Sequence, residues 1–575
     1  MKKSYSSLLY PTVILGLVVS IGTSAQAAGS AVDAGSILRQ TEKELNAPKA
    51  ARPREKSKPA PTPATNSVET TVRVEKFIFV GNSLLSAEVL NSALSSFVDR
   101  SLNLNQLREA VDVITNTYRD AGWTAKAFLP KQEISSGAVT IQIVESVFGG
   151  ASVQGVMPKR IDASRLVEMA EANLAKGKPM HSSDIDRTLL LLDDLTGVSV
   201  AGNLVEGQRD GETDLVISAV DESLLTGNAS LDNQGARATG IERLSANVNL
   251  NSPAGFGDLF STNLLQTRGT TYARGSYALP FGNNGLRAGL HASSLRYAVL
   301  TSYDANANGT RGTADTSGLD ISYPLLRSQL NNVNLVWSYD HKSLENYVAD
   351  ALNSNYKIKV SGLSLNSNHI DNWGGGGSTS TSLSVTHGRL NNDGSPNQQN
   401  DADGAHVAGS YRKINFYLNR LQSITSDLSF FAAFSAQAAN KNLDSSERMY
   451  LGGATGVRAF PASEAGGAEG RIVTLELRQR LDYAYTLAGF YDYGHVTVNK
   501  FNANVSNGAE ISAINAYALQ GYGLSLAWQS ANSIELKGAL AKRNGPNPAA
   551  DSTTGMDSDK TKKITRLWVS AGFAF

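Results

Sequence analysis

At 575 residues the chain is long enough for several domains, because a single hydrophobic core rarely grows beyond roughly 250–300 residues. It contains no cysteine, which excludes disulfides and thiolate metal sites. The 52 basic and 52 acidic residues balance, so the net charge gives no reason to expect nucleic acid or an anionic surface as a partner.

The first 27 residues have the pattern of a secretory signal peptide. Lys2 and Lys3 precede an apolar run over 8–21, and Ala25 to Ala27 supplies small residues for cleavage. A transmembrane anchor is the alternative, but the run is shorter than the roughly 20 residues that a spanning helix needs. No later segment reaches that length, so a membrane-seated mature protein is expected to be a β-barrel.

Residues 28–47 predict a short amphipathic helix, with apolar Ile37, Leu38 and Leu45 among charged neighbours. Residues 48–67 carry five prolines among basic and small residues, which is typical of a linker. A helix tethered in this way can dock elsewhere or leave. The alternative is a frayed N-terminus without a docking site.

The order strand, helix, helix, strand, strand then occurs twice, in 68–146 and in 147–222. In the first unit, apolar residues recur at helical spacing over 104–118, and the segments 125–129 and 139–144 alternate as strands. Two copies of about 75 residues indicate an internal repeat with an α+β fold.

From 223 to 575 the helical spacing gives way to alternating segments, which predict an all-β domain. In the last segment Leu567, Val569 and Phe573 face one way, and Phe575 ends the strand. About 350 residues at roughly 22 per strand and connection predict a 16-stranded antiparallel transmembrane β-barrel. A soluble β-sandwich also alternates, but the signal peptide, the final aromatic residue and the mixture of long and short connections favour the barrel.

A long glycine-rich connection holds Gly456, Val457, Arg458, Ala459 and Phe460. Counting strands back from a periplasmic C-terminus places this connection on the extracellular side. A carboxylate in a barrel wall requires a partner, and arginine offers two parallel hydrogen bonds.

The strand that follows is expected to turn Phe490, Asp492 and Gly494 toward the lumen. We therefore expect Arg458 to contact Asp492 inside the barrel. A solvated loop arginine and a lumen carboxylate without a special role are the alternatives.

The tetrad Val457-Arg458-Ala459-Phe460, the run Phe490 to Gly494 and the segment Tyr118…Gly122-Trp123…Glu145 resemble the outer-membrane transporters of two-partner secretion, within the Omp85 superfamily. The resemblance implies an N-terminal plug helix, two periplasmic POTRA domains (68–146 and 147–222) and a barrel whose inward-folded loop pairs with an aspartate. This chain departs from the family pattern at Ala459, where glycine is usual.

The resemblance further implies an outer-membrane translocator that recognises an unfolded exoprotein through its POTRA domains and secretes it through the lumen. The cargo class stays open between an adhesin, a cytolysin and a contact-dependent toxin. Other implied partners are outer-membrane lipid and the barrel assembly machinery, for which Phe575 is the expected insertion signal. The predicted groove residues for the exoprotein are Leu107, Val111, Tyr118, Ala125, Phe128, Leu191, Val198 and Val200.

Two other functions remain open at this point, an outer-membrane protein assembly factor of the same superfamily and a solute porin. POTRA domains that serve only as rigid spacers are a further alternative. The seven histidines show no metal-ligand spacing, and Asp393, Asp401 and Asp403 form a polar loop more typical of solvent exposure than of calcium binding. No enzyme motif appears, and no cofactor or metal is expected.

Overall fold

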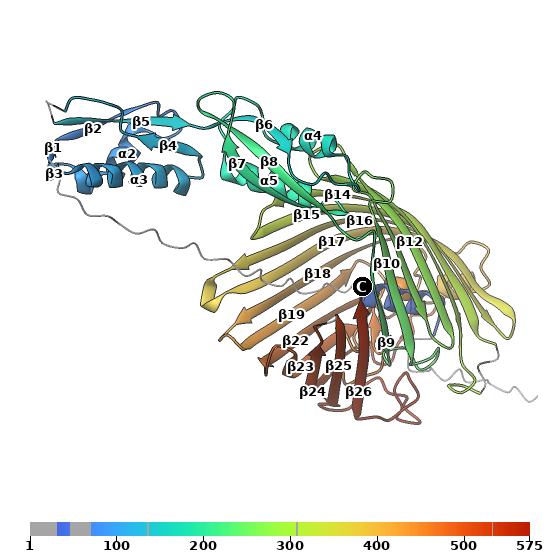
Figure 1. Cartoon of the computed structure of the whole chain (residues 1–575). Coiled ribbons are helices and arrows are strands. Elements are labelled where there is room, and N and C mark those ends of the chain that lie inside the picture. Colours follow the sequence, from blue (N-terminus) through green and yellow to red (C-terminus); the bar gives the residue numbers. More distant parts are fainter. Residues whose placement is uncertain (1–31, 46–70, 135–136, 306, 308, 532) are drawn as a thin grey trace, which may run out of the picture.

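The structure, a computed structural model, describes residues 32–45, 71–134, 137–305, 307, 309–531 and 533–575. The predicted signal peptide (1–27) and proline-rich linker (48–67) lie outside the described residues. The described chain forms one helix, two small α+β units and a closed barrel (Figure 1). None of the helices within these residues is long and apolar enough to cross a membrane.

The first unit packs two helices on a three-stranded sheet in the order β2-β5-β4. Asn103 is the N-cap of helix α3. Its side chain accepts a hydrogen bond from the Gln106 amide, and the Gln106 side chain accepts one from the Asn103 amide. The apolar face of the helix is buried. The pairing of two short strands, β1 with β3, is a feature that spacing alone did not predict. The elements are β1 (Val72–Val74), β2 (Lys76–Val80), α2 (Ala87–Ala93), β3 (Arg100–Leu102), α3 (Leu104–Asp120), β4 (Ala125–Phe128) and β5 (Ala138–Glu145).

The second unit repeats this topology. Its sheet order is β6-β8-β7, with the first strand parallel to the central one and the third antiparallel, as in the first unit. The predicted internal repeat is therefore present in the fold. The elements are β6 (Val147–Val153), α4 (Ala163–Asn173), α5 (Ser182–Asp193), β7 (Val198–Glu206) and β8 (Glu212–Asp221).

The barrel closes from sixteen antiparallel strands, as predicted, with β26 pairing back onto β9. Several strands are far longer than a membrane crossing requires. The strands are β9 (Leu225–Asp232), β10 (Arg243–Asn251), β11 (Leu259–Gln266), β12 (Thr270–Phe281), β13 (Leu286–Ala298), β14 (Arg311–Arg327), β15 (Asn331–Val348), β16 (Ala351–Asp371), β17 (Gly377–Asn391), β18 (Gly409–Ser423), β19 (Leu428–Ala439), β22 (Glu469–Arg480), β23 (Tyr485–Thr497), β24 (Ala516–Gln529), β25 (Ile534–Arg543) and β26 (Thr565–Ala574).

Side-chain burial alternates along the barrel strands. On β26, Leu567 and Val569 are exposed on the outer surface while Trp568 is buried in the lumen. On β22, Leu475 and Leu477 are exposed on either side of the buried Glu476. This apolar exterior and polar interior are what a lipid-facing barrel requires.

The second α+β unit is fastened to the short turns at one end of the barrel. Arg327 of β14 pairs with Asp194, with Nη2 2.7 Å from Oδ1, and Arg165 of α4 donates to Asn283 in the turn after β12 at 2.6 Å. The long connections, among them 440–468 and 544–564, therefore lie at the opposite end. Helix α1 (Ala34–Leu45) is inside the barrel (Figure 1).

Candidate functional site

Residues 440–468, which we call the inner loop, leave β19, fold into the lumen and return to β22. The loop contains a 3-10 turn, η3 (Ser445–Glu447), and a two-residue strand pair, β20 (Met449–Tyr450) with β21 (Gly466–Gly467). Its tip is packed in a hydrophobic cluster with residues of β23, β24 and β25. The predicted residues Val457, Ala459 and Phe460 at this tip are completely buried.

Arg458 and Asp492 meet in the lumen. The Nε and Nη2 atoms of Arg458 each lie 2.8 Å from one carboxylate oxygen of Asp492, and the Arg458 amide donates to the same carboxylate at 3.1 Å. Asp492 is completely buried. Two parallel charge-assisted bonds, with a third bond from the backbone, therefore hold the tip of the inner loop to β23.

Three further wall residues hold the same arginine, the predicted Phe490 and two that were not predicted from the sequence, Glu476 and Trp568. Glu476 on β22 accepts from Nη1 at 2.7 Å, and the ring centroid of Phe490 lies 3.4 Å from the guanidinium carbon. Trp568 on β26 donates from its indole to the Arg458 carbonyl at 2.7 Å. The loop is thus tied to three strands at once.

The departure at Ala459 has a local explanation on the facing strand. Ala459 does not adopt a positive φ, so its backbone is open to any L-residue. A Cβ built on Gly521 of β24 would lie 2.5 Å from the Ala459 Cβ. The missing side chain at position 521 therefore makes room for the methyl group at 459.

A second group of ion pairs holds the first part of the inner loop, ahead of its tip. Glu447, which is 2% exposed, lies 3.0 Å from Nζ of Lys342 on β15 and 2.7 Å from Nζ of Lys413 on β18. Burial alone would raise the pKa of Glu447, but the two lysines hold it below its usual range. The sequence gives no signal for this triad because its members lie on separate elements.

Helix α1 docks on the inner loop as well as on the wall. The Ser445 hydroxyl donates to Asp33 at 2.8 Å, the Arg39 side chain donates to the Arg448 carbonyl at 3.4 Å, and Gln40 pairs with Ser463. At the C-terminal end of the helix, Glu44 pairs with Arg243 of β10. The apolar face of the helix, with Ile37 and Leu38, is buried against the barrel wall.

The predicted POTRA grooves need one correction. Leu107, Val111 and Tyr118 are buried in the core of the first unit, and Leu191 and Val198 in the core of the second. Helical spacing selected the face that packs on the sheet, which a bound chain cannot reach. Phe128 is 42% exposed, and Ala125 and Val200 are partly exposed.

The strands behind the predicted grooves lie at sheet edges. Among the residues that the structure describes, β4 pairs only with β5 and β7 only with β8. Each strand therefore has a row of backbone groups without a partner strand, and an edge of this kind accepts an added strand.

The structure does not support calcium binding by the loop that contains Asp393, Asp401 and Asp403. Asp401 accepts from the amides of Val407 and Ala408 at 2.8 and 3.0 Å, so its carboxylate closes a turn. No group of three or more potential metal ligands is found within the described residues.

The sequence of this chain matches the models of a known family. The family described as haemolysin secretion/activation protein ShlB/FhaC/HecB matches residues 211–516, and the ShlB-type POTRA domain matches residues 72–146. The chain belongs to the haemolysin secretion/activation family. It is an outer-membrane transporter of two-partner secretion, and its POTRA domains lie in the periplasm.

Named relatives within the family extend over nearly the whole chain. The heme/hemopexin transporter protein HuxB of Haemophilus influenzae (strain 86-028NP) is 26% identical over 548 residues, which is 93% of this chain and 95% of HuxB. The hemolysin transporter protein HpmB of Proteus mirabilis is 24% identical and covers 90% of this chain and 89% of its own. The structure of CdiB from Escherichia coli shares the fold, with a TM-score of 0.65 at 19% identity over 90% of this chain and 93% of CdiB.

Proposed function

We propose that the transporter is a gated conduit whose resting lumen is closed by the inner loop and α1 together. The observation that carries this proposal is the nature of the contacts. Besides the apolar packing of the loop tip and of α1, both obstructions are held by a few specific ion pairs and hydrogen bonds, namely Arg458 with Asp492, Glu447 with two lysines, and Asp33 with Ser445. Contacts of this kind break and reform without unfolding the barrel.

The proposed cargo is an unfolded exoprotein that adds as a strand to the edges of β4 and β7. Backbone bonding supplies affinity without requiring a particular sequence, and Phe128 offers an exposed apolar contact beside the β4 edge. The chain performs no chemical step in this proposal. Relatives named for heme/hemopexin and hemolysin transport suggest a large secreted protein, of which an adhesin, a cytolysin and a contact-dependent toxin are the candidate classes.

Insertion into the outer membrane by the barrel assembly machinery is proposed to use Phe575. Its backbone exchanges two hydrogen bonds with Gly227, at 2.9 and 3.0 Å, and so extends the closing strand pair by one residue. Its ring stacks on Phe573 with centroids 6.2 Å apart on the outer surface. An exposed aromatic pair at the end of the last strand is accessible to a partner before the barrel closes.

Secretion of a co-expressed exoprotein tests strand addition. The Ser146 amide, next to β5, donates to the Thr124 carbonyl at 2.9 Å. Backbone groups of successive residues in a strand point to opposite sides, so the Ala125 amide points toward the free edge of β4. Ala125→Pro removes that donor and leaves the ladder to β5 intact, whereas the matched Ala125→Val keeps the donor. We expect secretion to fall at least tenfold in Ala125→Pro only, with unchanged pore conductance. Full secretion by Ala125→Pro would exclude strand addition at β4.

Secretion by Arg458→Ala and Asp492→Ala tests the gate. Arg458→Ala leaves Asp492 charged and completely buried in the lumen, and Asp492→Ala leaves Arg458 with Glu476 as its carboxylate partner. We expect both variants to fold as barrels and to lose secretion. If both secrete as well as the unsubstituted protein, the pair has no working role.

A further inference from the structure

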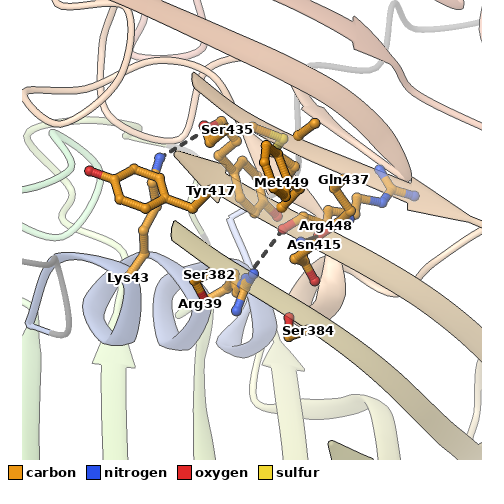
Figure 2. A pocket seen from close by; sticks show the side chains of 13 residues that line it. Arg39, Lys43, Ser382, Ser384, Asn415, Tyr417, Ser435, Gln437, Arg448 and Met449 are labelled. Atoms are coloured by element: carbon orange, nitrogen blue, oxygen red, sulfur yellow. Dashed lines mark hydrogen bonds between the residues drawn. The ribbon is translucent and has the colours of Figure 1, made fainter. Parts of the chain in front are cut away.

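A cavity of about 160 Å³ lies between α1, the inner loop and strands β17, β18 and β19 (Figure 2). Arg39 and Lys43 extend toward it from α1, and the wall supplies the polar groups of Ser384, Asn415 and Tyr417. At about 30 Å³ for each molecule of liquid water, the volume is on the order of five waters. This is room for one small anion.

The two cations from α1 have no carboxylate in contact. Within the described residues, neither Arg39 nor Lys43 takes part in an ion pair. Each donates instead to a backbone carbonyl of the inner loop, Arg39 to Arg448 at 3.4 Å and Lys43 to Tyr450 at 3.2 Å. A lysine carries three donors and an arginine five, so most of their donors remain for the cavity.

The positive charges of Arg39 and Lys43 also repel each other. Arg39 and Lys43 are four residues apart, which places them on one face of the helix. Burial, and then the charge of Arg39, lower the pKa of Lys43 to about 8. The Glu447 carboxylate, whose charge reaches Arg39, is already shared by Lys342 and Lys413. The described residues that line the cavity include three cations, Arg39, Lys43 and Arg448, and no carboxylate.

We propose that this cavity binds a small oxyanion, phosphate or a carboxylate, between Arg39 and Lys43. The anion would contact α1 on one side and the loop and wall on the other, so it links the helix to its docking site. Because the complete site exists only while α1 is docked, the anion stabilises the closed lumen. Inorganic phosphate and an acidic side chain of a passing polypeptide share the required chemistry.

Binding is tested on the purified full-length protein, without any secretion assay, so that its failure is distinct from failure of the proposed function. Sodium phosphate is titrated by calorimetry against chloride at equal ionic strength. We expect saturable binding that weakens at least tenfold in Arg39→Gln and in Lys43→Met. Arg73→Gln, which removes one exposed positive charge from the first POTRA domain, is the matched control and is expected to bind phosphate as before.

Channel recording gives a second measurement that needs no variant. In planar bilayers, phosphate at about 100 times its dissociation constant should reduce the opening frequency of the unsubstituted protein up to about 100-fold. A glutamate-rich hexapeptide that competes with phosphate identifies peptide carboxylates as ligands, and lack of competition identifies a free inorganic ion. Absence of saturable phosphate binding, or equal binding by the Arg39 and Lys43 variants, would overturn the proposal.

Discussion

Glu447→Gln is expected to free the first part of the inner loop while Arg458 still holds its tip. The substitution keeps the shape of the side chain but removes the charge shared by Lys342 and Lys413, whose amines lie 3.0 and 2.7 Å away. Removing one member of a buried ion pair costs about 3–5 kcal/mol. Because a lysine that loses its partner can release a proton or gain water, we expect about 2–3 kcal/mol. At 1.36 kcal/mol per factor of ten, the loop should open about 30 to 150 times more often.

The absence of cysteine makes this measurable with a single reporter thiol. Ser446→Cys places the thiol in the first part of the inner loop, beside Glu447, at a position that is 1% exposed. Labelling by a maleimide then requires the loop to open, and the labelling rate follows the open population when closing is faster than labelling. We expect Glu447→Gln in this background to label about 30 to 150 times faster than its parent.

Glu469→Gln is the matched control. Its partner Lys500 lies 2.7 Å away, but the two side chains are 26% and 37% exposed. Pairs open to solvent contribute about 0.2–1 kcal/mol, so labelling should rise less than about sixfold. A rise below threefold in Glu447→Gln, or equal rises in both variants, would show that the lysine pair does not hold the loop.

Gly35→Ala should undock α1, because a Cβ there would overlap the Ser445 hydroxyl and lie 2.8 Å from the Ser446 amide; open-channel conductance should then appear more often, with Ala34→Gly as control. Glu145→Gln should destabilise the first POTRA domain by about 1–2 kcal/mol, seen as faster hydrogen exchange over 72–146 of the full chain. Burial alone would raise the pKa of Glu145, but hydrogen bonds from the Ser83 hydroxyl and from two backbone amides lower this pKa below its usual value. Its contribution is therefore present above the ordinary glutamate pKa and lost as the pH falls through the lowered one. Gly521→Ala should displace the loop tip, and secretion should recover when Ala459→Gly is added, whereas additive losses would contradict the packing account.

The features that the sequence predicted well are those with a strong local period. Alternation fixed which side chains of β26 face lipid, since a shift of one residue would expose Trp568 and bury Leu567. The Tyr118…Glu145 spacing also has a physical basis, because the tyrosine hydroxyl donates to Glu145 at 2.8 Å.

The features that the sequence did not reveal depend on contacts between residues that are far apart in the chain. Glu447 and Lys342 are separated by 105 residues, and no periodicity relates a loop carboxylate to a wall lysine. The groove prediction erred for the opposite reason, because the regular spacing of Leu107 and Val111 is the signature of a core face. Backbone edges carry no side-chain pattern, so side-chain spacing alone could not show that β4 and β7 lie at sheet edges.

The contacts of α1 couple this helix to any movement of the inner loop out of the lumen. The helix rests on η3 through Asp33 and Ser445 and on the returning arm of the inner loop through Gln40 and Ser463. The loop therefore cannot leave the lumen without breaking these contacts or carrying the helix with it. Once the loop contacts are lost, three contacts still hold the helix to the wall: the pairing of Glu44 with Arg243, the hydrogen bond from the Ala34 amide to Asn346 on β15 at 2.8 Å, and the apolar face. Movement of the inner loop out of the lumen therefore requires either the loss of its contacts with α1 or the release of α1 from the wall.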